Sequence, residues 1–224
     1  MSYLIAIDGL DGSGKGTQSE LLQAALARAG HPASLISFPR YDSESSSLVR
    51  LYLGGGIGSS PDDTNAFAAS AFYACDRYIS YKTEWGNKLA SGEIVICNRY
   101  TSANAVHQLA KLPRCEWDGF LAWLYDLEFA RFGIPTPDLT IYLEQTPEIS
   151  AKLVEKRSSA TGQVKDIHEL DRDFMRRSYD AAMYASDKLG WSRIRCYEGD
   201  EPLSIEAVEE MIHCVVEEKL KIKL

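Results

Sequence analysis

The chain has 224 residues, of which 45% are hydrophobic and 25% are charged, and we expect residues 1–224 to form a single α/β domain. Its formal net charge of −8 argues against a nucleic-acid polymer or an anionic membrane as the main partner. Five scattered cysteines and the lack of an apolar run near the length of a membrane span argue against a disulfide framework and a membrane protein, so we expect a cytoplasmic location.

The first predicted element is a buried strand over residues 3–7, and a helical pattern begins near Lys15. The turn between them follows the order G-x-x-x-x-G-K and contains Gly9, Leu10, Asp11, Gly12, Ser13, Gly14, Lys15, Gly16 and Thr17. Glycines let backbone N–H groups approach a polyphosphate, the helix N-terminus attracts its charge, and the lysine adds a full positive charge. This turn, here called the phosphate loop, is therefore predicted to bind the phosphates of ATP. A hydroxyl usually follows the lysine, but here it comes one residue later, at Thr17.

Strand and helix patterns alternate along the rest of the chain. Further strands are predicted at residues 33–38, 93–97, 139–143 and 193–197. A short helix is predicted to end near residue 53. Further helices are predicted over residues 60–81, within parts of 99–132, over 146–157 and 170–189, and from residue 204 onward. This alternation predicts a five-stranded parallel sheet flanked by helices on both faces, a three-layer α/β fold. Ligands of such a fold bind at the carboxyl ends of the strands.

Basic residues gather at those predicted strand ends. Arg40 and Arg99 each follow a strand, Arg77 lies in the long helix, and Arg157 ends a later helix. Together with Lys15 they exceed what one triphosphate needs, so we expect two phosphate ligands, a donor and an acceptor. Two of these arginines also fit simpler roles. Arg77 is compatible with a surface salt bridge to Asp76 or another neighbour, and Arg157 is compatible with a basic residue that complements the dipole at the C-terminus of its helix.

A polar segment follows the helix that is predicted to end at Arg157. Residues 158–166 contain one apolar anchor at most, which is typical of a mobile loop. We expect a short lid over about residues 157–168 that closes on the bound substrates and excludes water.

The chain resembles the thymidylate kinases over nearly its full length. The resemblance rests on the phosphate loop and on the stretches Phe38–Tyr41, Asp76–Tyr78, Asn98–Asn104 and Lys165–Glu169. It implies a P-loop NTPase fold and transfer of the γ-phosphoryl group of ATP to dTMP, giving ADP and dTDP. It also implies Mg²⁺ as cofactor and a homodimer, and the aromatic residues of the 99–132 region are compatible with either core or a dimer face.

The resemblance also implies roles for individual residues. Lys15, Arg99, Arg157 and Asp11 are expected to act in catalysis, with Lys165 as the alternative lid cation. The expected dTMP-binding residues are Asp11, Arg40, Tyr41, Tyr73, Arg77, Arg99, Asn104, His107 and Gln108. Among them Tyr73 is expected to stack on the base, Arg77 to donate to a base carbonyl and Asn104 to bond the base edge.

Three positions depart from the family pattern. Asn98 stands where an aspartate usually assists magnesium, and Asp8 or Asp11 are the candidates to compensate, so no metal ligand is assigned. The phosphate loop has no arginine, which places the catalytic cation on the lid. His107 stands where relatives often carry tyrosine, which leaves the preference for deoxyribose open. Two other readings remain: a kinase for another nucleoside monophosphate or a deoxynucleoside, and a non-catalytic nucleotide-binding regulator.

Overall fold

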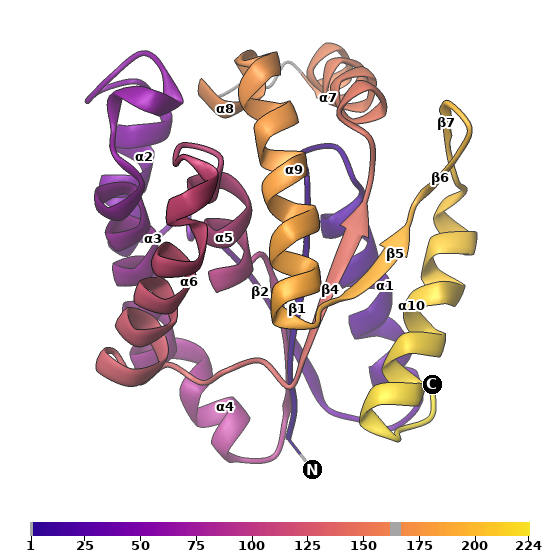
Figure 1. The fold of residues 1–224 in the computed structure, drawn as a ribbon. Helices are drawn as coiled ribbons and strands as arrows, with labels where there is room; N and C mark the ends of the chain where they lie inside the picture. Colours follow the sequence, from indigo (N-terminus) through magenta and orange to yellow (C-terminus); the bar gives the residue numbers. More distant parts are fainter. Residues whose placement is uncertain (1, 162–166) are drawn as a thin grey trace.

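The computed structural model describes residues 2–161 and 167–224, and its centre is a parallel sheet. The strands are β1 (Leu4–Gly9), β2 (Ala33–Ser37), β3 (Ile94–Asn98), β4 (Leu139–Glu144) and β5 (Ser192–Arg195). They pair in the order β2-β3-β1-β4-β5, and every pairing is parallel (Figure 1). The five-stranded parallel sheet predicted from the sequence is therefore confirmed.

Helices cover both faces of this sheet. They are α1 (Lys15–Arg28), α2 (Ser47–Leu53), α3 (Ala66–Ser80), α4 (Gly86–Ala90), α5 (Thr101–Leu109), α6 (Trp117–Tyr125), α7 (Pro147–Thr161), α8 (Ile167–Leu170), α9 (Arg172–Leu189) and α10 (Ile205–Leu220). A small hairpin of β6 (Tyr197–Glu198) and β7 (Glu201–Pro202) precedes α10. π-Helical turns follow α3 at Tyr81–Trp85 and α6 at Asp126–Arg131.

The central strand β1 contributes to the core on both of its sides, because successive side chains of a strand point to opposite faces. Ile5 and Ile7 pack in a cluster with side chains of α1 and α10. Leu4 and Ala6 pack in a second cluster that contains Trp85. Helices α5 and α9 join a third cluster around Leu10, on the loop that follows β1. These clusters make the three layers, and Leu10 anchors the loop after β1 in one of them.

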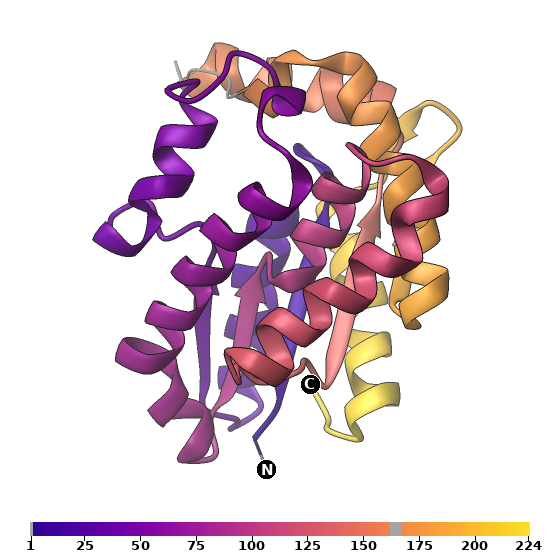
Figure 2. The ribbon, with the colours of Figure 1, turned by 60° about the vertical axis from the view of Figure 1, so that its left-hand side comes forward.

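The carboxyl ends of the strands form one open end of the molecule. Figures 1 and 2 show α2, α7 and α8 gathered at this end, while both chain termini lie at the opposite end. Within the described part of the chain, no helix is long and apolar enough to cross a membrane.

Two predicted helix boundaries were wrong. The long helix begins at Ala66 and not at Ser60, because Asn65 caps it by accepting a hydrogen bond from the Ala68 N–H. Ser60 and Asp63 instead form a capping box around a single 3₁₀ turn, so two competing caps lie close together in the sequence.

The second wrong boundary lies in the predicted lid. Helix α7 continues four residues past Arg157, and residues 167–170 form the short helix α8. Asp171 then caps α9 through the Phe174 N–H. Much of the predicted loop is thus helical, and its remaining residues, 162–166 with Lys165 among them, lie outside the described residues.

Candidate active site

The phosphate loop connects β1 to α1. Gly12 and Gly14 both have a φ of 83°, a conformation that L side chains rarely adopt, and Gly14 is the N-cap of α1. The ammonium group of Lys15 donates to the carbonyl oxygen of Leu10 at 2.9 Å and lies 3.4 Å from Asp11. No acidic residue occupies the first turn of α1, so its N–H groups and its dipole are available to an anion.

Gly12→Ala is expected to lower the free energy of unfolding by at least 1–2 kcal/mol, roughly the cost of a left-handed L residue. A Cβ atom at this position would also lie 2.9 Å from the carbonyl oxygen of Ser150 and 3.1 Å from the side chain of Leu153. Denaturant unfolding of the two proteins measures this difference.

Two other glycines provide matched controls for that variant. Gly14→Ala meets the same backbone strain, but no atom lies within 4 Å of the added Cβ, so its loss should be smaller. Gly119, inside α6, has open space and no positive φ, so Gly119→Ala should stabilise the protein by about 0.5–1 kcal/mol. Equal effects of all three substitutions would contradict this account of the loop.

A cluster of charges lies beside the phosphate loop. Arg99 follows β3 with a φ of 68°, and its guanidinium group pairs with Asp11, lies 3.9 Å from Asp8 and lies 3.2 Å from Nε2 of His107. Burial opposes ionisation of Asp11, but the charges of Arg99 and Lys15 outweigh it and hold its pKa well below the usual range. Burial raises the pKa of Asp8 despite the same two cations. The strained backbone of Arg99 is typical of a functional position.

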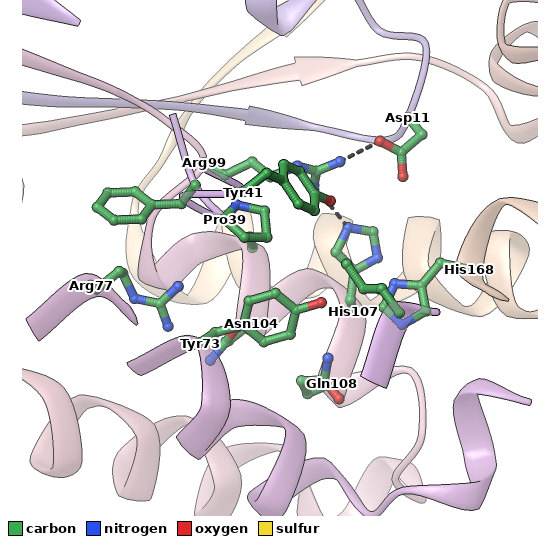
Figure 3. A pocket seen from close by; sticks show the side chains of 13 residues that line it. Asp11, Pro39, Tyr41, Tyr73, Arg77, Arg99, Asn104, His107, Gln108 and His168 are labelled. Carbon is green, nitrogen blue, oxygen red and sulfur yellow. Dashed lines mark hydrogen bonds and ion pairs between the residues drawn. The ribbon is translucent and has the colours of Figure 1, made fainter. Parts of the chain in front are cut away.

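Two connected cavities meet at Asp11 and Arg99. One, here called the inner pocket, is shown in Figure 3. It is lined by Asp11, Phe38, Pro39, Tyr41, Leu53, Tyr73, Arg77, Arg99, Ala103, Asn104, His107, Gln108 and His168. The other, here called the loop cleft, is wider and follows the phosphate loop. The inner pocket thus opens directly onto the predicted phosphate site.

The floor of the inner pocket carries Tyr73, Arg77 and Asn104. The Arg77 guanidinium forms two hydrogen bonds of 2.6 Å to Glu128, and both side chains are almost fully buried. A surface salt bridge with Asp76 is therefore wrong for Arg77. Asp76 instead accepts from the Arg40 N–H and from Ser45.

Two histidines and an amide form the opposite wall of the pocket. The ring centroids of His107 and His168 lie 5.4 Å apart, and Nε2 of His168 lies 2.7 Å from the Tyr52 hydroxyl oxygen. Burial lowers the pKa of His107 well below its usual value and lowers that of His168 to about 3, so both rings are neutral at pH 7. Both amide atoms of Gln108 are buried and have no hydrogen-bond partner within residues 2–161 and 167–224. This wall can therefore bond polar groups of an uncharged ligand part such as a sugar.

Two predicted arginines lie outside the inner pocket. The Arg40 guanidinium pairs with Glu84 at 2.7 Å and lines neither cavity. Arg157 lines the loop cleft and pairs with Glu169. The structure therefore brings together the other predicted acceptor residues, but it leaves these two side chains engaged with glutamates at the edge of the site.

Three residues of the site had no role predicted from the sequence. Glu128, which holds Arg77, lies 51 positions away and carries no local signal. His168 belongs to a stretch that resembles the family, but its place beside His107 depends on how α8 folds back. Arg50 of α2 lines the loop cleft, and a basic residue on a short helix gives no indication of that position.

Oxygen atoms suited to a hard cation lie beside Lys15 in the loop cleft. Asn98 donates from its amide nitrogen to Ser37 at 3.3 Å, while its buried amide oxygen has no partner in the described part of the chain. Gly16 and Thr17 line the same cleft, so a hydroxyl is present as well. The described residues contain no group of three or more potential ligands among histidine, cysteine and carboxylate side chains. This set fits Mg²⁺, which keeps several waters and takes its other ligands from phosphates.

The glycine-rich loop on a parallel sheet, joined to a second pocket with its own arginines, defines a P-loop nucleoside monophosphate kinase. A family model described as thymidylate kinase matches residues 7–212. The chain belongs to the thymidylate kinase family. It is 32% identical over 192 residues to a thymidylate kinase of Mycobacterium tuberculosis, covering 84% of this chain and 87% of that protein.

Two further comparisons extend over nearly the whole chain. A human thymidylate kinase is 26% identical over 219 residues, covering 97% of this chain and 91% of the human protein. The solved structure of thymidylate kinase from Candida albicans superposes with a TM-score of 0.70 at 20% identity, covering 97% of this chain and 92% of that one. The last comparison concerns the fold, and it agrees with the P-loop fold predicted from the sequence.

Proposed function

We propose that the protein transfers the γ-phosphoryl group of ATP to dTMP, giving ADP and dTDP. The observation that carries this proposal is the junction of the two cavities at Arg99, where a donor on the phosphate loop meets an acceptor in the inner pocket. Such a junction lets the two phosphates approach in line, and positioning is the main task of a phosphoryl-transfer enzyme.

On the donor side, we assign the phosphates of ATP to the phosphate loop. The N–H groups of residues 9–17 surround them, and Lys15 follows the transferring group. Arg157 lies across the loop cleft and supplies the lid cation when Glu169 releases it, with Lys165 as the alternative. Asn98 and Thr17 are the residues that would hold Mg²⁺ through water or directly, and the ion would neutralise charge on the β- and γ-phosphates.

On the acceptor side, we assign the base to the floor of the inner pocket. Tyr73 stacks on the ring, while Arg77 and Asn104 bond its edge. Tyr41, His107 and Gln108 surround the sugar. Arg99 binds the acceptor phosphate beside Asp11, and Arg40 joins it by leaving Glu84. The phosphate is already ionised near pH 7, so the reaction needs no strong general base.

We further propose a cytoplasmic homodimer, formed by residues 1–224 as one kinase domain. Exposed apolar side chains of α2 and α3 support the dimer: Leu48, Leu51, Phe67 and Ile79. Sedimentation of the purified protein distinguishes a dimer from a monomer.

The test of the reaction is ADP formation from Mg·ATP with a panel of acceptors: dTMP, dUMP, UMP, CMP, AMP and thymidine. Turnover fastest with dTMP and weaker with dUMP supports the proposal. Equal turnover with UMP would show that His107 does not exclude a ribose, and fast turnover with thymidine would indicate a deoxynucleoside kinase. Binding of ATP and dTMP without turnover would overturn the proposed reaction and favour a regulator.

The pH profile of kcat/KM for ATP should fall above about pH 8. Burial, and to a lesser extent Arg99, lowers the pKa of Lys15 to about 8, so the free enzyme loses this charge as the pH rises. An anionic phosphate favours the charged form, and ATP binding must therefore take up a proton at high pH. The slope should approach one decade per pH unit.

Lys15→Arg is the matched variant for that profile. An arginine stays protonated throughout, so the alkaline limb should disappear even if the rate is lower. A wild-type profile that stays flat to about pH 9.5, more than a unit above the expected pKa, would contradict the assignment to Lys15.

A further inference from the structure

The ion pair between Arg77 and Glu128 lies beneath the inner pocket. Arg77 donates from Nε and Nη2 to the two carboxylate oxygens, both at 2.6 Å, and the two side chains are 1% and 0% exposed. Thr101 donates its hydroxyl to the same carboxylate at 3.0 Å. Nη1 of Arg77 donates to the carbonyl oxygen of Tyr100 at 3.3 Å. The three bonds from Arg77 fix the plane of its guanidinium group, and the bond from Thr101 holds the carboxylate in place.

Glu128 reaches this buried position from the π-helical turn Asp126–Arg131. The backbone carbonyl of Glu128 accepts from the Ile134 N–H at 3.1 Å, which anchors the end of the turn. Asp126 and Arg131, in the same turn, form an exposed ion pair at 2.9 Å. A π-helical turn is uncommon and often lies at a functional site. Here it directs the Glu128 carboxylate inward while Asp126 and Arg131 stay at the surface.

Burying two charges is costly, so a buried ion pair often stabilises a protein no more than apolar side chains of the same size would. Its effect on the pocket is more specific. A guanidinium group has five N–H groups, and the contacts above use three of them. Arg77 also lines the inner pocket beside Tyr73 and Asn104, and Figure 3 shows its guanidinium group directed toward these two residues. The remaining N–H groups can therefore meet the base.

We propose that Glu128 is a positioning residue that sets the base selectivity of the acceptor site, an inference that rests on the proposed function. By fixing Arg77, it makes this part of the pocket a rigid hydrogen-bond donor with no acceptor capacity. A carbonyl oxygen of thymine or uracil satisfies such a donor. The amino group of cytosine is itself a donor, so it and the Arg77 N–H face each other and neither has an acceptor. Such unpaired buried polar groups are the strongest basis for rejecting a ligand.

Glu128→Gln tests this role, because the amide keeps the shape and places an N–H₂ group or a single acceptor against Arg77. We expect the ratio of kcat/KM for dTMP over dCMP to fall by about tenfold or more, with a higher KM for dTMP and an unchanged KM for ATP. Thr101→Val removes one hydrogen bond to the carboxylate, so a smaller fall of about threefold is expected. Asp126→Asn, at the exposed pair of the same turn, should leave the ratio unchanged.

A second pair of variants separates positioning from folding. Arg77→Met alone and Arg77→Met/Glu128→Met together should share one dTMP-to-dCMP ratio, because Glu128 acts only through Arg77. Arg77→Met alone leaves the Glu128 carboxylate buried without its partner, whereas the double variant leaves no buried charge and is expected to fold even if Glu128→Gln does not. A folded Glu128→Gln protein with unchanged selectivity, or a different ratio in the double variant, would overturn the inference.

Calorimetric binding of dTMP and dCMP to the same proteins keeps this result apart from the proposed reaction. If the wild-type protein binds dTMP in preference to dCMP without turning it over, the proposed reaction fails while the role of Glu128 is still measured. If it turns dTMP over and Glu128→Gln keeps the full binding preference, only the role of Glu128 fails.

Discussion

Lys15→Met is expected to lower kcat by about three orders of magnitude. This is the scale of effect when an enzyme loses one group that stabilises charge on a transferring phosphoryl or acyl group. Lys15 is the lysine of the phosphate loop, and its ammonium group lies 2.9 Å from the carbonyl oxygen of Leu10. Methionine fills a similar volume and removes the charge. Initial rates of ADP formation at saturating ATP and dTMP measure the effect.

The control for this variant is the same substitution at the surface. Lys219, at the end of α10, is about half exposed and far along the chain from every site residue, so Lys219→Met should keep the wild-type rate. Circular dichroism and thermal unfolding establish that Lys15→Met is folded. A fall in kcat of less than about tenfold in a folded protein would show that Lys15 does not follow the transferring group.

Arg99→Met is the second substitution for which we expect a large effect, and it should impair use of the acceptor, dTMP. We expect kcat/KM for dTMP to fall by about two to three orders of magnitude, while the KM for ATP changes far less. Arg99 is the one arginine at the junction of the two cavities whose side chain contacts Asp11, and no other described cation of the inner pocket lies beside the phosphate loop. Steady-state kinetics with each substrate varied in turn separate the two KM values.

A double variant accounts for the partner that Arg99 leaves behind. Without the arginine, Asp11 is a largely buried carboxylate with Lys15 as its neighbouring cation, and its low pKa should rise. Arg99→Met/Asp11→Asn removes both charges, so it should recover thermal stability without recovering dTMP turnover. Recovery of turnover would mean that Arg99 acts by neutralising Asp11 and not by binding the acceptor.

Much of this site could be predicted because its signals are local in sequence. The phosphate loop lies within nine residues, and Arg99 directly follows a strand whose end the hydrophobic pattern marks. The sheet places such strand ends together without any further information. The strands themselves were predicted to within one or two residues of their observed bounds.

What the sequence could not indicate depends on contacts between distant segments. Glu128 meets Arg77 across 51 positions, and nothing in the local pattern around its π-helical turn indicates this contact. The Arg40 side chain pairs with Glu84, 44 positions further along the chain, at a π-helical turn that no periodicity marks. The prediction of helix ends was wrong where two capping residues lie close together in the sequence, as Ser60 and Asn65 do.

The ion pair of Asp11 and Arg99 also bears on how the protein responds to the small anions around it. The Arg99 guanidinium group is already paired with an anion, which is the protein's own carboxylate. A chloride or sulfate ion must displace a covalently attached competitor, whose local concentration is high and constant. A nucleotide contributes its base and sugar as well, and these contacts supply the free energy for the exchange. A single small ion therefore lacks the binding free energy to displace Asp11 from Arg99, whereas a complete substrate has it.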